Sequence, residues 1–337
     1  MTTPRSIHGH PADSLAPRLG SWEQVVRLEH LESIDGPSRG ARRVRMVTGG
    51  GLDLELHPDR ALDIGHVTVD GVPVSWISAT GFAGPGSYDP RGSLWMQTFG
   101  GGLLATCGLR NFGGASVDGG EEFGQHGRVG RLPAAITRSE VADGMLVVEG
   151  EVREVSPMGE SLVLRRRISA EVGGLGIRIE DRVRNEGGMA CPVMILYHLN
   201  FGWPLLDDGT TIEVPAAETV PRDDDAAAGL DRVGRFGPPE PGATERVFLH
   251  RFDGSAPRAR VANLQRGLAV DIAASDTLPH LFQWTMDAAG TYVLGIEPAN
   301  TPVIQGRAAA REAGVLESLE PGEERAYSVT LDFSRLG

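Results

Sequence analysis

Apolar and polar residues alternate with a period of two along most of the chain, and this pattern constrains the fold more than any other feature. Residues 145–155 carry Leu146, Val148 and Val152 on one face, and residues 177–183 continue the alternation. Successive side chains of a β-strand point to opposite faces, so the pattern is typical of half-buried strands. We therefore predict an all-β fold built from antiparallel strands.

Turn residues separate the alternating segments. Asp70-Gly71 links two of them as a tight hairpin, and Gly173-Gly174 links two longer ones. Only residues 308–313 show a short helical pattern. Further strands are expected at residues 193–199, 247–252, 268–272, 281–285, 292–296 and 326–333. The prediction is a single large β-sandwich domain over residues 1–337 with few short helices, in which residues 1–20 are loosely ordered.

The composition excludes several kinds of chemistry. All 32 basic residues are arginine, because the sequence contains no lysine. A Walker-type phosphate loop, a Schiff base and a lysine general base all need that residue. The net charge of −13 argues against a nucleic-acid partner, since phosphate neutralisation needs a clustered basic surface. The longest basic run, Arg165-Arg166-Arg167, lies in an alternating segment, and we expect it on a solvated strand face.

Targeting signals are not evident in the sequence. Residues 1–20 lack the apolar core of a secretory signal, and no stretch approaches the roughly 18 apolar residues of a membrane span. The two cysteines are too few for a disulfide framework. These features predict a cytoplasmic protein with no membrane partner; a homodimer remains open.

Two segments interrupt the alternation. Residues 81–130 are rich in glycine and carry aromatic and polar side chains, and loops of this length inside a domain are usually functional. Residues 215–242 contain Asp223-Asp224-Asp225, which we interpret as a solvated loop rather than a metal site. Strands of the same character continue on both sides, so neither segment is expected to link two domains.

Polar residues beside glycines and aromatics form the candidate site. Arg110, Asn111 and Phe112 lie between glycines, His126 lies in a second loop, and His198 and Glu297 stand at the ends of apolar strands. Two histidines, a carboxylate and an arginine could perform acid/base chemistry. Further candidates supply apolar faces or hydrogen bonds to a ligand, namely Trp203, Gln283 and Trp284.

The order of these motifs resembles the aldose 1-epimerase, or galactose mutarotase-like, superfamily, most closely an aldose-1-epimerase-like branch of it. The resemblance rests on Gln125-His126-Gly127, the strand 179–187 with its Val183-Arg184-Asn185, Tyr197-His198 and Ile296-Glu297-Pro298, and it extends over residues 41–333. It implies a galactose mutarotase-like supersandwich that interconverts sugar anomers without a cofactor or a metal.

The resemblance also implies individual roles. Glu297 matches the general base that takes the anomeric proton, and His198 matches the general acid that protonates the ring oxygen. His126 matches the second histidine near the ring oxygen, and Arg110 matches the arginine that holds sugar hydroxyls. The chain departs from the usual Asn-His-Tyr-Phe-Asn-Leu segment, since it reads Tyr197-His198-Leu199-Asn200-Phe201. A sugar-binding aspartate common in the family has only Asp271 and Asp287 as candidates here.

Two other functions stay open at this point. A sugar-binding protein could use the same fold without catalysis. A metal-assisted sugar isomerase or lyase could use His126, His198 and a carboxylate such as Glu122 as ligands. Arg60, Arg110 and Arg128 leave an anionic substrate open. The sugar and the anomer are not specified by the sequence.

Overall fold

The computed structural model describes residues 6–84 and 91–337, and strands dominate this part of the chain. Its named strands pair in antiparallel fashion throughout, as the alternating sequence predicts. One sheet has nine strands, in the spatial order β11 (Ala135–Ala142), β12 (Met145–Val155), β13 (Ser161–Glu171), β14 (Gly176–Asn185), β26 (Glu324–Arg335), β22 (Leu268–Ala274), β21 (Arg258–Asn263), β17 (Thr210–Glu213) and β19 (Arg235–Phe236).

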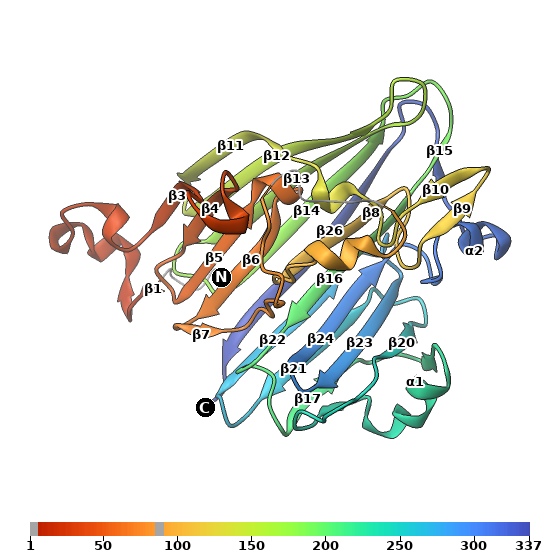
Figure 1. Cartoon of the computed structure of the whole chain (residues 1–337). Helices are drawn as coiled ribbons and strands as arrows, with labels where there is room; N and C mark the ends of the chain where they lie inside the picture. Colours follow the sequence, from red (N-terminus) through yellow and green to blue (C-terminus); the bar gives the residue numbers. More distant parts are fainter. Residues whose placement is uncertain (1–5, 85–90) are drawn as a thin grey trace.

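Two further sheets are smaller. A six-stranded sheet has the order β18 (Glu218–Pro221), β20 (Arg246–Arg251), β23 (His280–Ala288), β24 (Thr291–Ala299), β16 (Met194–Phe201) and β8 (Leu104–Leu109). A five-stranded sheet has the order β3 (Arg27–Glu32), β4 (Arg42–Val47), β5 (Leu52–His57), β6 (Asp63–Val69) and β7 (Val72–Pro73). Figure 1 shows these two sheets side by side, with the long strands of the nine-stranded sheet behind them.

Short elements complete the described part. Three two-stranded ribbons pair β1 (Ser6–Ile7) with β2 (His10–Pro11), β9 (Ser116–Asp118) with β10 (Glu121–Phe123), and β15 (Cys191–Pro192) with β25 (Ser318–Leu319). The α-helices of this part are α1 (Asp224–Ala228) and α2 (Arg307–Glu312). None of its helices is long and apolar enough to cross a bilayer.

The main core lies between the sheets, where the inward faces of all three meet. Leu146 and Val148 of β12 face inward, as their alternation predicts, and so do Tyr197 of β16 and Ile296 of β24. A second apolar cluster covers the opposite, outer face of the six-stranded sheet and includes Phe282 of β23. That outer face also carries the candidate site.

The prediction for the arginine run is wrong at its central residue. Arg165 and Arg167 lie on the solvated face, but the side chain of Arg166 is fully buried. Its guanidinium pairs with Asp181 at 2.6 Å and with Asp63 at 2.8 Å. Alternation turns every second residue inward, and two buried carboxylates from β6 and β14 compensate the charge there.

The network around Arg166 continues toward the six-stranded sheet. The Tyr197 hydroxyl donates to Asp181 at 2.7 Å, and the Thr106 hydroxyl donates to Asp63 at 2.5 Å. Tyr197 precedes His198 on β16, and Thr106 pairs with Tyr197 from β8. The buried charges therefore join all three sheets directly beneath the candidate site.

The two irregular segments contain more regular structure than predicted. Residues 81–130 include the strand β8, although part of that segment, 85–90, lies outside the described residues. Asp223 caps the short helix α1 by accepting from the Ala226 backbone N–H at 3.0 Å, so the acidic triplet is not a loop. The hairpin at Asp70-Gly71 and the helix near residues 308–313 are confirmed.

Candidate active site

His198 and Glu297 face each other on the outer face of the six-stranded sheet. The antiparallel pairing of β16 with β24 matches Leu199 to Ile296 and Leu196 to Ala299, which sets His198 opposite Glu297. His198 Nε2 lies 3.4 Å from Glu297 Oε1. The strand alternation explains this placement, because the neighbouring residues Tyr197 and Ile296 point into the main core.

Burial changes the proton affinity of both groups. His198 and Glu297 are 5% and 2% exposed. Burial, with a smaller contribution from the charge of Glu245 and against that of Arg222, raises the pKa of Glu297 to about 8. Burial also lowers the pKa of His198 well below its ordinary value. At neutral pH the pair therefore consists of a protonated carboxyl and a neutral imidazole.

Both groups also have buried polar atoms that lack a partner. Within the described part of the chain, Glu297 Oε1 and His198 Nδ1 make no hydrogen bond. Leaving such atoms unpaired costs about 1–3 kcal/mol each, and unpaired buried groups concentrate where a ligand or a reaction uses them. These two atoms are therefore available to a ligand or to proton transfer.

Gly295 makes room for the carboxyl group. A Cβ at residue 295 would lie 2.5 Å from Glu297 Oε1 and 3.1 Å from Trp284 Cβ. Residues 295 and 297 share one face of β24, so a side chain at 295 would displace the carboxyl. Glycine therefore occupies the position toward which the Glu297 side chain is directed.

His126 approaches the pair from the loop after β10. Its backbone is in the left-handed region, with φ 57°. Backbone hydrogen bonds join it to Gly108 and Gly113, and its Nδ1 accepts from the Gly113 N–H at 3.4 Å. The two imidazole rings are 5.7 Å apart and edge to face. Burial lowers the pKa of His126 to about 4, so this ring is neutral and presents Nε2–H.

Aromatic side chains form the walls around these three residues. The Trp284 ring lies 5.3 Å from the His198 ring, and Phe99 lies 5.4 Å from it. Trp95 packs against His126 at 4.5 Å, and Trp76 stands edge to face with Trp284. Trp76, Trp95 and Phe99 were not among the predicted site residues, since nothing in the local pattern distinguishes them from core aromatics.

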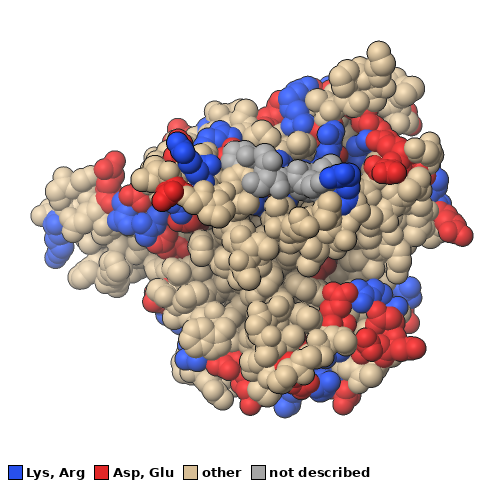
Figure 2. Space-filling view, viewed as in Figure 1, with Lys and Arg blue, Asp and Glu red and all other residues tan. Residues whose placement is uncertain are grey.

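A charged cluster lies on the rim near Glu297. Glu245 accepts a hydrogen bond from Trp284 Nε1 at 3.0 Å and pairs with Arg222 at 3.0 Å. Arg222 pairs in turn with Asp223 at 2.7 Å. Figure 2 shows acidic side chains gathered over α1, beside a largely uncharged surface at the middle of the same face.

The predicted ligand-binding residues of the 108–114 segment serve the scaffold. Arg110 is buried and forms ion pairs with Glu121 and Glu160. The Asn111 amide donates to two loop carbonyls and accepts from the Arg307 N–H, and Phe112 packs in the second apolar cluster. Together these three side chains hold the loop that contains His126 in place.

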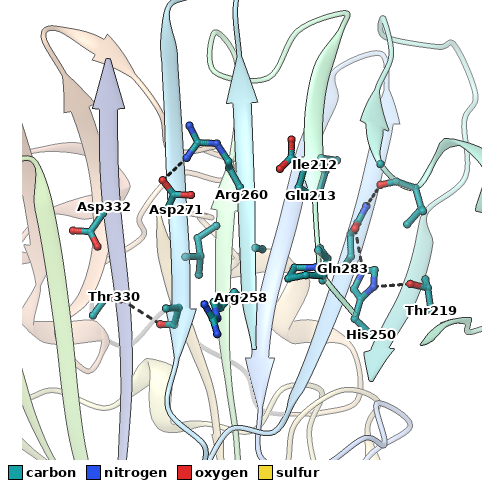
Figure 3. Close-up of a pocket in the computed structure, with 17 residues that line it drawn as sticks. Ile212, Glu213, Thr219, His250, Arg258, Arg260, Asp271, Gln283, Thr330 and Asp332 are labelled. Carbon is teal, nitrogen blue, oxygen red and sulfur yellow. Dashed lines mark hydrogen bonds and ion pairs between the residues drawn. The ribbon is translucent and has the colours of Figure 1, made fainter. Parts of the chain in front are cut away.

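Gln283 points away from the pair, into the space between the sheets. Its neighbour Trp284 occupies the outer face, so alternation turns Gln283 inward. There it accepts from His250 Nε2 at 3.1 Å, and His250 Nδ1 accepts from the Thr219 hydroxyl at 2.9 Å. Figure 3 shows these three hydrogen-bonded side chains on the wall of a separate pocket. The volume of this pocket is about 640 Å³. Trp203, another predicted contact, is 61% exposed beside Arg266.

The remaining charged candidates have partners in the protein. Asp287 pairs with Arg246 at 2.6 Å, and Asp271 pairs with Arg260 on the wall of the pocket that contains Gln283. Arg60 donates to the Thr98 and Ala83 carbonyl oxygens, and Arg128 pairs with Glu154. These contacts leave none of the four directed at the His198 and Glu297 pair.

Metal ligands do not converge in the described residues. Over 6–84 and 91–337, no group of three or more His, Cys, Asp or Glu side chains could hold a metal ion. Glu122, the third ligand of the metal-assisted alternative, lies exposed on β10. The side chains gathered around His198 instead suit acid/base chemistry on an uncharged ligand with an apolar face.

The fold is that of galactose mutarotase-like proteins. A structure described as a "putative aldose 1-epimerase" from Klebsiella pneumoniae superposes with a TM-score of 0.84, at 21% identity over 91% of this chain and 83% of that chain. A galactose mutarotase-like protein from Clostridium acetobutylicum and a galactose 1-epimerase from Lactobacillus acidophilus superpose with TM-scores of 0.64 and 0.63. Each is 12% identical over 93% of this chain and 100% of the other.

The sequence itself places the chain in a family. Residues 38–333 match the model of the family described as a domain of unknown function, DUF4432, and the chain belongs to that family. No curated protein matches the sequence. The predicted galactose mutarotase-like supersandwich fold is confirmed, while the family description assigns no reaction.

Proposed function

We propose that this chain is an aldose 1-epimerase-like isomerase, which interconverts the anomers of a sugar by opening and reclosing its ring. The observation that carries the proposal is the buried pair of His198 and Glu297, 3.4 Å apart, with polar atoms that the protein leaves unpaired. The names of the structural neighbours point to the same chemistry.

The reaction needs one proton donor and one proton acceptor at neighbouring oxygens. A cyclic sugar opens when the ring oxygen gains a proton while the anomeric hydroxyl loses one. The bond between C1 and the ring oxygen breaks, and the free aldehyde can rotate before the ring closes on its other face. Glu297 and His198 supply one donor and one acceptor, and each positioned proton transfer contributes about 10²–10⁴-fold.

The surrounding side chains suit a pyranose. Half-buried Trp76 and Trp284 offer apolar faces for the C–H surface of the ring, and His126 Nε2–H can donate to a sugar oxygen. Glu245 and Arg222 stand at the rim, where they can bind hydroxyl groups. The absence of lysine also leaves no side-chain amine to trap the open-chain aldehyde.

The test is a panel of freshly dissolved aldoses, uronic acids and sugar phosphates, with anomer exchange followed by NMR with and without protein. We expect faster exchange for at least one neutral aldose, both before and after treatment with a chelator. Tight binding of a sugar without faster exchange would favour the non-catalytic alternative. If the purified protein holds stoichiometric metal and the chelator removes both the metal and the activity, the metal-assisted alternative is favoured.

A further inference from the structure

Asn200 lies two residues after His198 on β16, on the same outer face of the sheet, and is fully buried. Its Nδ2 donates to the carbonyl oxygen of Gly102 at 3.0 Å and to that of His198 at 2.9 Å. These two bonds use both hydrogens of the amide. They therefore fix which end of the amide is oxygen, and Oδ1 remains as its free acceptor.

Two buried atoms at this place lack a partner within the described residues, Asn200 Oδ1 and His198 Nδ1. Both side chains lie on the same face of β16, and the Asn200 amide already donates to the His198 carbonyl oxygen. Asn200 also opposes the lowering of the His198 pKa by burial. A carbonyl oxygen can only accept a hydrogen bond. An imidazole nitrogen that pairs with Asn200 Oδ1 must therefore carry the hydrogen.

The second histidine shows the opposite arrangement. His126 Nδ1 accepts from the Gly113 backbone N–H, so its hydrogen is on Nε2. The His126 ring meets the His198 ring edge to face, and the loop backbone sets the tautomer of His126.

We propose that Asn200 is a positioning residue that holds His198 with its hydrogen on Nδ1, so that the bare Nε2 faces Glu297 and acts as the proton acceptor. This proposal rests on the proposed function. It reverses the roles that the family resemblance implies for Glu297 and His198.

Both protons of the ring-opening step are accounted for. Glu297 gives its proton to the ring oxygen, and His198 Nε2 takes the proton of the anomeric hydroxyl. The bond from C1 to the ring oxygen breaks as the C1 carbonyl forms. The sugar stays neutral, and the pair becomes a carboxylate beside an imidazolium whose Nδ1–H donates to Asn200 Oδ1. Ring closure returns both protons.

A pH profile alone cannot distinguish the two assignments. A protonated Glu297 with neutral His198 holds as many protons as a carboxylate with an imidazolium, so both give the same dependence of rate on pH. The protonation of each ring nitrogen distinguishes them, and ¹⁵N NMR of histidine-labelled protein measures it without any substrate. The resonances of His198 are assigned by their loss in His198→Gln.

In the wild-type protein at pH 7 we expect His198 to be neutral, with Nδ1 protonated and Nε2 bare. A His198 ring protonated on Nε2, or on both nitrogens, would overturn the proposal. The spectrum does not depend on turnover. If no sugar on the panel is turned over while this tautomer is observed, the proposed function fails and the tautomer assignment stands.

Three variants complete the test. Asn200→Leu should move the His198 hydrogen to Nε2 and slow anomer exchange at least about tenfold, since a wrong histidine tautomer disables acid/base catalysis. Asn200→Asp should hold His198 as an imidazolium and slow exchange at pH 7, because a charged ring cannot accept. Unchanged Nδ1 protonation in Asn200→Leu, or faster exchange in Asn200→Asp, would contradict the proposal.

Asn300→Leu is the matched control. Asn300 is buried directly after the end of β24 and joins it to the start of β16, where it accepts from the Ile195 N–H and donates to the Val193 carbonyl oxygen. Its loss should cost stability but leave the His198 tautomer unchanged. A shifted tautomer in this variant would mean that the effect at Asn200 is structural.

Discussion

His198 and Glu297 stand opposite each other on adjacent strands, with Nε2 and Oε1 3.4 Å apart and both side chains almost completely buried. Burial works in opposite directions on the two groups, because it favours the neutral form of each. It raises the pKa of Glu297 to about 8 and lowers that of His198 well below its ordinary value. One mobile proton therefore belongs to the pair at neutral pH.

The first prediction concerns the dependence of activity on pH. The value of kcat/KM reports the free enzyme, and it should be level near neutral pH. It should fall above about pH 8, where Glu297 is deprotonated, and at acidic pH, where His198 becomes an imidazolium. NMR exchange rates, corrected for spontaneous mutarotation at each pH, check this. A rate that keeps rising above pH 9 would contradict it.

Two rim variants should move the alkaline limb in opposite directions. Glu245 raises the pKa of Glu297 and Arg222 lowers it, each by its charge. Glu245→Gln should therefore shift the limb to lower pH, and Arg222→Gln should shift it to higher pH. If both variants shift the alkaline limb in the same direction, they act through conformation instead of charge.

The second prediction concerns Gly295. Gly295→Ala would place a Cβ 2.5 Å from Glu297 Oε1, so the carboxyl must move. Because a displacement of about 1 Å can cost about 10²-fold, we expect kcat to fall roughly tenfold to a hundredfold. Gly188→Ala is the control, since a Cβ there meets no atom within 4 Å. Wild-type kcat in Gly295→Ala would mean that the observed carboxyl position is not the one used in catalysis.

The third prediction concerns the aromatic wall. Trp284→Ala removes the face beside His198 and the hydrogen bond to Glu245. We expect kcat/KM to fall about tenfold or more, equivalent to at least about 1.4 kcal/mol. Trp22→Ala, which removes an exposed indole from the N-terminal part of the chain, should have no effect on sugar turnover. Equal losses in the two variants would remove the support for Trp284 as a sugar-contacting residue.

The fourth prediction concerns stability. Arg166→Met leaves Asp63 and Asp181 buried without their cation, and breaking a buried pair in this way costs about 3–5 kcal/mol. Arg165→Met, one residue away on the exposed face, should cost less than about 1 kcal/mol. Urea unfolding of both variants measures the difference. Similar losses would show that the buried network contributes no more than a surface pair.

Sequence patterns predict the strands and the central pair but not the partners of most polar residues. The alternation predicts that Glu297 and Ile296 lie on opposite faces of their strand, and the order of the motifs identifies His198 as its partner. Arg166 was misassigned because its partner Asp63 is more than a hundred positions away in the chain. The prediction of Gln283 and Arg110 as ligand contacts fails for a related reason, because local sequence does not reveal their partners. Gln283 hydrogen-bonds to His250, and Arg110 forms ion pairs with Glu121 and Glu160.

The central claim is that His198 and Glu297 act as one acid/base unit, and a double-mutant cycle on anomer exchange tests it most directly. Glu297→Gln and His198→Gln should each slow exchange of the best substrate by about 10²–10⁴-fold, with circular dichroism showing that both variants remain folded. The double variant should be about as slow as the slower single variant, because residues that act together are not additive. Exchange at the wild-type rate in either single variant would contradict the account.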